Sequence, residues 1–365
     1  MVRHLRRCVF TLLTTFIAAH AVAFEWQVDI TPVDQLFPAL QLSQASRSGA
    51  STRFGGGDGL VSVHVRGGDI PADLRVRIET PGLRAPATVM PGAGSVPGSL
   101  DLRPLLDWDV DDLAHLRAPR RQTMTVTLEA PGRLPESRRV AVRVHPLDDA
   151  LYFVREGQDR VDLGWAFAGY VNPADPVVDE VLAAARAFDP AFDAAPSGRG
   201  DDVDRRRVGA VWAALERRGL RYANGDPALS RGPSVWSQRV RLLRSIWDDR
   251  QANCLDSSVL IASVLERLGL RTFIVLVPGH AFVGFQSRSV GDAAHYLETT
   301  LLGARPSTTA PLANYDSALR AGRARWRRVA AKFDGRHGPA YARVDIVTAR
   351  SYGIIPFSAA RSRSQ

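Results

Sequence analysis

The chain has 365 residues, 45% of them hydrophobic, and a formal net charge of +9. This length is enough for two domains, each with a buried core. Its two cysteines, Cys8 and Cys254, are too few for a disulfide-stapled scaffold or for a metal site built on several thiolates.

Residues 1–23 have the layout of a secretory signal peptide. Three arginines in the first seven residues precede an apolar stretch that is too short to span a bilayer, and 21–23 form a small-x-small cleavage pattern. A membrane anchor is the alternative, but His20 interrupts the apolar run. We therefore expect an exported protein, periplasmic or secreted, that loses Cys8 with the leader and keeps no transmembrane segment.

Residues 24–150 are predicted to form a β-rich domain. Apolar and polar residues alternate there in short runs, as in strands with one face against a core. The runs are 60–65, 74–78, 124–128 and 139–144. Such a series favours a small immunoglobulin-like β-sandwich. Its histidines (His64, His115 and His145) lack metal-ligand spacing, so we interpret this domain as a binding or spacing module.

Residues 151–356 are predicted to form a second, more helical domain. Helices are expected over 177–188 and 203–218, and a further element over 236–247 ends just before the cysteine. The basic excess of the chain lies on this half, which indicates either a weak preference for anionic partners or a solvated arginine-rich surface. The Ser/Arg-rich tail, 357–365, is expected to be disordered.

Cys254 is predicted to lie in the first turn of a buried helix. Asn253 is a good N-cap, and Asp256 can complete a capping box. The residues that follow are apolar on almost every face, and Gly269 ends the helix. A thiol at this position lies near the positive end of the helix dipole and near unpaired amides, which favour a thiolate and can stabilise an oxyanion. An inert, buried thiol is the alternative.

A histidine and an acid follow this helix on predicted strands. The apolar run 272–277 indicates a central strand, and His280 begins a second strand after a tight turn. Glu298 lies in a third strand, predicted over 296–298. If the hairpin packs on the helix, His280 can face the thiol and Glu298 can orient the imidazole. Thiol, base and orienting acid together are the arrangement of nucleophilic acyl transfer.

These segments resemble the transglutaminase-like superfamily, a branch of the papain-like cysteine fold. The residues that carry the resemblance are 253–256, 277–284 and 297–300, with weaker similarity at 167–173 and 237–241. It covers roughly residues 160–305 and not the β-rich half. The resemblance implies a nucleophile helix packed on an antiparallel sheet, and so an α+β protein with an additional N-terminal β-sandwich.

The resemblance also implies a role for each residue. Cys254 is the nucleophile, His280 the general base and acid, and Glu298 the residue that orients the histidine. Aspartate is commoner than glutamate at that position in the superfamily, and Asp292 and His295 are alternatives for the role.

Relatives in the superfamily place a side-chain donor upstream of the nucleophile to assist the oxyanion. Gln238 is our candidate for this donor, with Trp236 and Gln251 as rivals. The expected function is therefore an exported thiol peptidase or amidase acting on a protein or peptide. Hydrolysis is favoured over cross-linking because no amine-acceptor site is recognisable.

No cofactor, metal or nucleic-acid partner is expected, because the sequence contains no nucleotide loop and no nucleic-acid motif. The alternative is a catalytically inactive binding or scaffolding protein of the cell envelope. In that case the N-terminal domain would dock a partner and the thiol would be idle.

Overall fold

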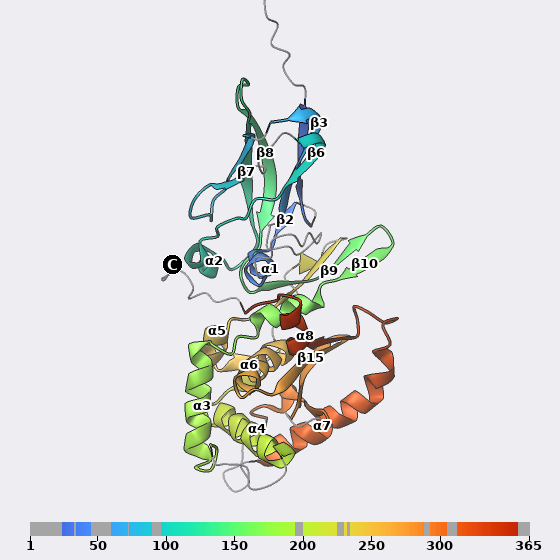
Figure 1. Cartoon of the computed structure of the whole chain (residues 1–365). Helices are drawn as coiled ribbons and strands as arrows, with labels where there is room; N and C mark the ends of the chain where they lie inside the picture. The colour runs from blue at the N-terminus through green and yellow to red at the C-terminus, as the bar shows by residue number, and fades with distance from the viewer. Residues whose placement is uncertain are drawn as a thin grey trace, which may run out of the picture.

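The computed structural model is an α+β protein (Figure 1). It describes residues 24–32, 34–44, 60–71, 73–89, 96–193, 200–224, 230–231, 234–287, 293–304 and 312–356. The predicted leader, 1–23, and the predicted tail, 357–365, lie outside the described residues. Within these ranges no helix combines the length and the apolarity needed to span a bilayer.

The described part of the N-terminal half contains two sheets, with strand orders β1-β3-β6 and β2-β8-β7-β4-β5. The strands are β1 (Phe24–Ile30), β2 (Gln35–Leu36), β3 (Val61–Ile70), β4 (Arg75–Glu79), β5 (Ala87–Val89), β6 (Val96–Leu102), β7 (Arg120–Glu129) and β8 (Glu136–Val144), with helices α1 (Pro38–Leu42) and α2 (Val110–His115). Alternate residues of β4 and β7 are buried, as the period-2 pattern predicts. The buried residues of both sheets belong to one hydrophobic cluster.

The described part of the C-terminal half contains three sheets, with orders β10-β9-β13-β12, β17-β16-β15-β18 and β11-β14. Their strands are β9 (Asp149–Glu156), β10 (Asp159–Asp162), β11 (Arg221–Tyr222), β12 (Ser230–Arg231), β13 (Val235–Arg239), β14 (Gln251–Ala252), β15 (Arg271–Val277), β16 (His280–Gln286), β17 (His295–Leu297) and β18 (Ala342–Asp345). The helices are η1 (Gly164–Tyr170), α3 (Pro176–Phe188), α4 (Gly200–Arg217), α5 (Leu243–Asp249), α6 (Cys254–Arg267), η2 (Thr299–Leu301), α7 (Ala313–Val329), η3 (Ala330–Lys332) and α8 (Ile346–Ser351).

Helix α6 is the centre of this half. Every residue from Leu255 to Leu265 is buried, because the helix is apolar on nearly all faces and must be surrounded. It packs on β15 and β16 on one side and contacts α3, α4 and α5 on the others (Figure 1). The predicted nucleophile helix and the hairpin beside it are thereby confirmed as elements.

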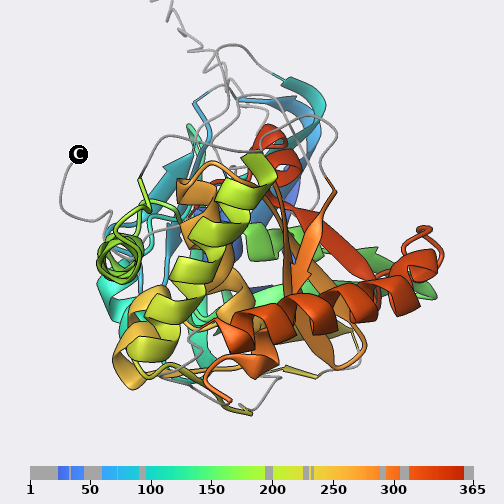
Figure 2. The ribbon, with the colours of Figure 1, turned by 90° about the horizontal axis from the view of Figure 1, so that it is seen from below.

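Helix α7 lies along β17 at the edge of the sheet (Figure 2). Gly322 permits this close packing, because a Cβ at that position would overlap with the backbone carbonyl of Tyr296. The last turns of α7 therefore approach the residues that follow β17.

Two expected elements differ in the structure. The single element predicted over 236–247 is a strand, β13, followed by a short helix, α5. Glu298 is not part of a strand: the pairing of β17 with β16 ends at Leu297, and Glu298 is the N-cap of η2. The acid thus lies at the start of a turn, where its own carboxylate accepts the amide of Thr300.

The two halves meet where β8 ends and β9 begins. His145 is fully buried there, with Nδ1 2.6 Å from Asp149 Oδ2 and Nε2 2.8 Å from Gln35 Oε1. A second contact joins the two halves, because the Ile355 amide donates to the Ser43 carbonyl at the end of α1. His145 is therefore part of a structural junction.

Candidate active site

The first turn of α6 holds the free thiol. Asn253 Oδ1 accepts the amides of Leu255 and Asp256 at 2.8 and 2.9 Å, and Asp256 Oδ2 accepts the Asn253 amide at 3.2 Å. This is the predicted capping box. Cys254 follows the cap directly, and its side chain is half-buried.

The cap changes which amides can serve an oxyanion. The expectation of several unpaired amides next to Cys254 is wrong, because Asn253 already accepts two of them. Within the part of the chain that the structure describes, the amide of Cys254 itself donates to no acceptor. One backbone donor is therefore available at the nucleophile, and a second donor has to come from a side chain.

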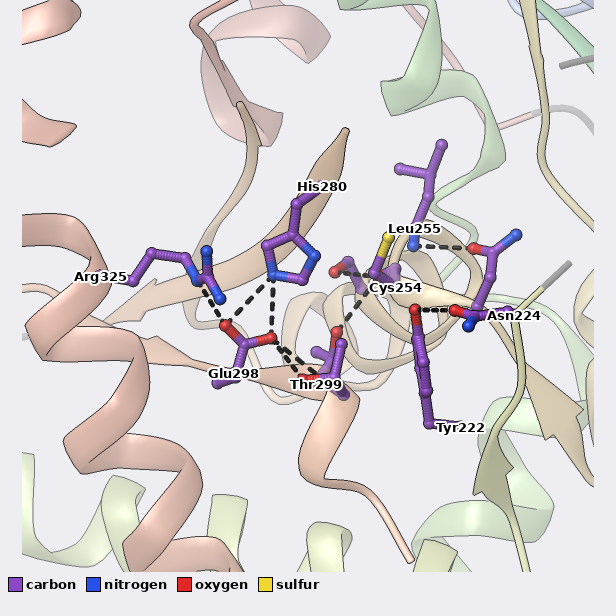
Figure 3. A network of polar contacts seen from close by, with 11 residues as sticks. Tyr222, Asn224, Cys254, Leu255, His280, Glu298, Thr299 and Arg325 are labelled. Carbon is purple, nitrogen blue, oxygen red and sulfur yellow. Dashed lines mark hydrogen bonds and ion pairs between the residues drawn. The ribbon is translucent and has the colours of Figure 1, made fainter. Parts of the chain in front are cut away.

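His280 lies between Cys254 and Glu298 (Figure 3). Its Nε2 is 2.9 Å from Glu298 Oε1 and 3.2 Å from Oε2, and the other ring nitrogen is on the side of Cys254. Burial alone would lower the pKa of His280, but a hydrogen bond with the Cys254 side chain and the carboxylate of Glu298 raise it to about 9. The site thus favours a protonated imidazole beside the thiol.

Glu298 is held by three partners and its side chain is only 5% exposed. In addition to His280, Arg325 Nε donates to Oε2 at 2.6 Å and the Thr300 hydroxyl donates to Oε1 at 2.8 Å. Burial would raise the pKa of Glu298, but His280, Thr300 and Arg325 together lower it to about 2. The carboxylate is therefore charged over the whole range in which an imidazole titrates.

The turn that carries Glu298 is tied to the nucleophile helix. The Thr299 hydroxyl donates to the Cys254 carbonyl at 3.2 Å (Figure 3). This bond joins the acid-bearing turn directly to the first turn of α6.

A cavity of about 500 Å³ opens beside Cys254 and His280. Aromatic residues from β9, η1, β11 and β13 form part of its wall: Tyr152, Phe153, Phe167, Tyr222 and Trp236. An apolar cavity next to a nucleophile and base can receive the side chains of a substrate while its reacting group meets the thiol.

The other residues proposed from the sequence differ in whether they line this cavity. Gln238 and Trp236 line the cavity, and Gln238 Nε2 makes only a long contact, 3.4 Å, to the carbonyl of Arg239. Gln251 is exposed and faces a different hollow. His295 donates to or accepts from Asp201, at 2.7 Å, and does not line this cavity, while Asp292 lies outside the described residues.

Three neighbouring residues have no counterpart in the sequence-based prediction. Arg325 lies 27 positions after Glu298 in a polar helix, so no local pattern marks it. Tyr222 and Asn224 line the cavity, and the Tyr222 hydroxyl donates to Asn224 Oδ1 at 2.7 Å. Burial, together with the negative charges of Cys254 and Glu298, raises the pKa of Tyr222. The parallel pairing of β11 with β14, just before Asn253, places this tyrosine at the site.

Among the residues that the structure describes, no three His, Cys, Asp or Glu side chains form a group that could hold a metal ion. The chemistry that the described groups can perform is that of a thiolate with an imidazolium beside it and an oriented carboxylate behind it.

The chain matches none of the known protein families. A mycothiol acetyltransferase of Thermobifida fusca (strain YX) is 30% identical to it over 152 residues, which are 39% of this chain and 43% of that protein. The chain thus aligns with less than half of the length of this relative. The similarity is partial and assigns the chain to no family.

Proposed function

We propose that the protein is an exported thiol enzyme that cleaves or transfers an amide or peptide acyl group. The observation that carries the proposal is the position of His280, between the capped thiol of Cys254 and the buried carboxylate of Glu298. Those three groups fulfil the roles of nucleophile, acid–base and orienting group. The partial similarity to an acetyltransferase does not contribute to the proposal.

In the first step the Cys254 thiolate attacks the carbonyl carbon of the amide. The oxyanion that forms accepts the free amide of Cys254 and, after a rotation of its side chain, the Gln238 carboxamide. The carbon–nitrogen bond then breaks, and His280 gives its proton to the leaving amine. An acyl-thioester on Cys254 and a neutral imidazole result.

In the second step water or an amine resolves the thioester. Neutral His280 takes the proton of the attacking molecule, the carbon–sulfur bond breaks, and the thiolate and imidazolium are restored. We favour water as the acceptor, because the described cavity offers no recognisable group for orienting an amine.

The fold family of each half is part of the same proposal. A buried nucleophile helix on the antiparallel sheet β17-β16-β15-β18 supports a transglutaminase-like, papain-like domain over 151–356. The two sheets of residues 24–150 support an immunoglobulin-like sandwich, which we propose positions the enzyme or docks an envelope partner.

Activity-based labelling tests the proposed function. Wild-type protein is treated with a library of peptide-like electrophiles, and the site of modification is read by mass. We expect modification at Cys254 and peptide hydrolysis by the wild type. In Cys254→Ala we expect no labelling and a loss of turnover of about three orders of magnitude or more.

Two outcomes would favour the inactive binding protein instead. One is equal turnover in the wild type and in Cys254→Ala. The other is an alkylation rate of Cys254 no faster than that of glutathione at the same pH, since a thiol activated by a neighbouring base should react faster than a free one.

A further inference from the structure

A cluster of two aromatic rings and two arginines lies on the sheet β10-β9-β13-β12. The rings of Phe153 and Trp236 are stacked, with centroids 4.5 Å apart and planes 11° apart. The guanidinium of Arg155 lies over Trp236 at 5.1 Å, and that of Arg160 lies over Phe153 at 5.7 Å. We call these four residues the aromatic–arginine cluster.

The strand register puts the four side chains of the cluster on one face. Arg155 is directly opposite Arg160 in the β9–β10 pair, and Phe153 is directly opposite Trp236 in the β9–β13 pair. Phe153 and Arg155 are two residues apart on β9 and therefore share a face. Two like charges directly opposite each other on a sheet repel, so this placement costs stability unless an anion lies between or beside them.

The chain supplies no such anion in the part that the structure describes. Neither Arg155 nor Arg160 forms an ion pair with a described side chain, whereas Arg239 on the neighbouring strand is paired with Asp148 at 2.8 Å. Asp162 is opposite Phe153 in register; its carboxylate accepts the Gly164 amide at 2.8 Å and forms no described ion pair with either arginine. The cluster thus presents two exposed arginines that form no ion pair with any described side chain.

The cluster adjoins the candidate active site. Phe153 and Trp236 form part of the wall of the cavity that Cys254 and His280 also line. A guanidinium lying over an aromatic ring keeps its N–H groups along its edges, where they can bind a carboxylate through two parallel hydrogen bonds. The rings hold these cations at the cavity without neutralising them.

We propose that the aromatic–arginine cluster is a subsite for a carboxylate on the substrate, so that the protein acts on acidic peptides or amides. This inference rests on the proposed function, because it assigns the substrate of Cys254. The subsite binds the anionic group and leaves the scissile carbonyl in the cavity beside the thiol.

A pair of probes that differ only in charge tests the subsite. N-iodoacetyl-glutamic acid α-amide and N-iodoacetyl-glutamine α-amide have nearly the same shape, and both alkylate thiols. Their rates at Cys254 are measured by mass at low ionic strength. We expect the wild type to prefer the acidic probe by about fivefold, as for one partly exposed ion pair, and 0.5 M NaCl to reduce that preference.

Variants assign the preference to the cluster. Arg155→Gln and Arg160→Gln should each reduce the ratio of the two rates, and the double variant should bring it to about one. Arg138→Gln is the matched control: Arg138 also lies over an indole, that of Trp26 at 4.4 Å, but on β8 in the N-terminal half, and its loss should leave the ratio unchanged. A folding defect slows both probes equally, so the ratio isolates the effect of charge.

The two proposals fail in different ways. An unchanged ratio in the double variant, or no preference in the wild type, would overturn the carboxylate subsite even if the neutral probe reacts rapidly. A neutral probe that reacts with Cys254 no faster than with glutathione would overturn the proposed function, whatever the ratio.

Discussion

Glu298 carries one negative charge and faces two cationic partners. His280 Nε2 lies 2.9 Å from Oε1 and 3.2 Å from Oε2 of the carboxylate, and Arg325 Nε lies 2.6 Å from Oε2. Burying a carboxylate against one partner alone often costs more than the pairing returns, and the second cation offsets that cost. Both cations therefore hold the Glu298 carboxylate in its charged form beside His280.

The pH dependence of turnover tests the role of Glu298. His280 must be protonated to serve the leaving amine, so kcat/KM should decline as pH rises through about 9, the pKa of His280. In Glu298→Gln the imidazolium loses its charged partner, its pKa falls, and this alkaline limb should move to lower pH. Arg325→Gln is the control, since it keeps the carboxylate and should not move the limb downwards. A limb at the same pH in Glu298→Gln would contradict the assignment.

The same two groups make the free energy of unfolding depend on pH. The pKa of His280 is raised above its ordinary value of 6.5. Its contribution to the free energy of unfolding is therefore complete below pH 6.5 and is lost as pH rises through about 9. The pKa of Glu298 is lowered from 4.5, so its contribution is present above pH 4.5 and is lost as pH falls through about 2. Both contributions are complete between about pH 4.5 and 6.5.

At the scale of elements, the cap of α6 also joins that helix to β13. Asp256 is buried, and its Oδ1 accepts the amide of Arg241, two residues after the strand that carries Gln238 ends. The cap therefore sets both the first turn around Cys254 and its distance from the proposed oxyanion donor.

Local patterns explain which parts of this site the sequence predicts. The cap, the buried helix and the hairpin are encoded within a few residues each, and the structure confirms them. The sequence does not predict that 236–247 divides into strand β13 and helix α5. Val235 and Ser237 are buried on either side of a less buried Trp236, but so short an alternation is not enough to define a strand. Arg325 and Tyr222 reach the site through long-range packing, which no period in the sequence encodes.

Removing the cap tests its function. Asn253→Ala should lower the free energy of unfolding by about 1 kcal/mol and slow the alkylation of Cys254, because the first turn is no longer held against His280. Asp109→Ala is the matched control: Asp109 caps α2 with the same two-amide pattern, so the loss of stability should be similar and the alkylation rate unchanged. Equal alkylation rates in both variants would show that the cap does not position the thiol.

At the scale of the whole molecule, a seam of contacts joins the two halves. Ser43 at the end of α1 meets Gly169 of η1, and the segment after α8 runs past both: the Ile355 amide donates to the Ser43 carbonyl. Arg350 holds the C-terminal side of the seam together, since its guanidinium donates to the carbonyls of Ala168 and Val171 and pairs with Glu266 at the end of α6. Ser43 and Ile355 lie far apart in the chain, so the sequence predicts a β-rich half and a more helical half but not how the two halves meet.

Gly169 is the position at which the seam can be tested. A Cβ there would overlap with the Cβ of Ser43, and the residue has no positive φ, so the effect of Gly169→Ala is steric. We expect Gly169→Ala to cost about 1–3 kcal/mol, seen as a lower midpoint of thermal unfolding. Ser43→Gly removes the opposing Cβ and should restore most of that loss in the double variant, because the two residues are in direct contact. Gly68→Ala, at a position where an added Cβ meets nothing within 4 Å, controls for the substitution itself. If Ser43→Gly restores nothing, the loss in Gly169→Ala arises within η1, and the contact between the two halves does not contribute to stability there.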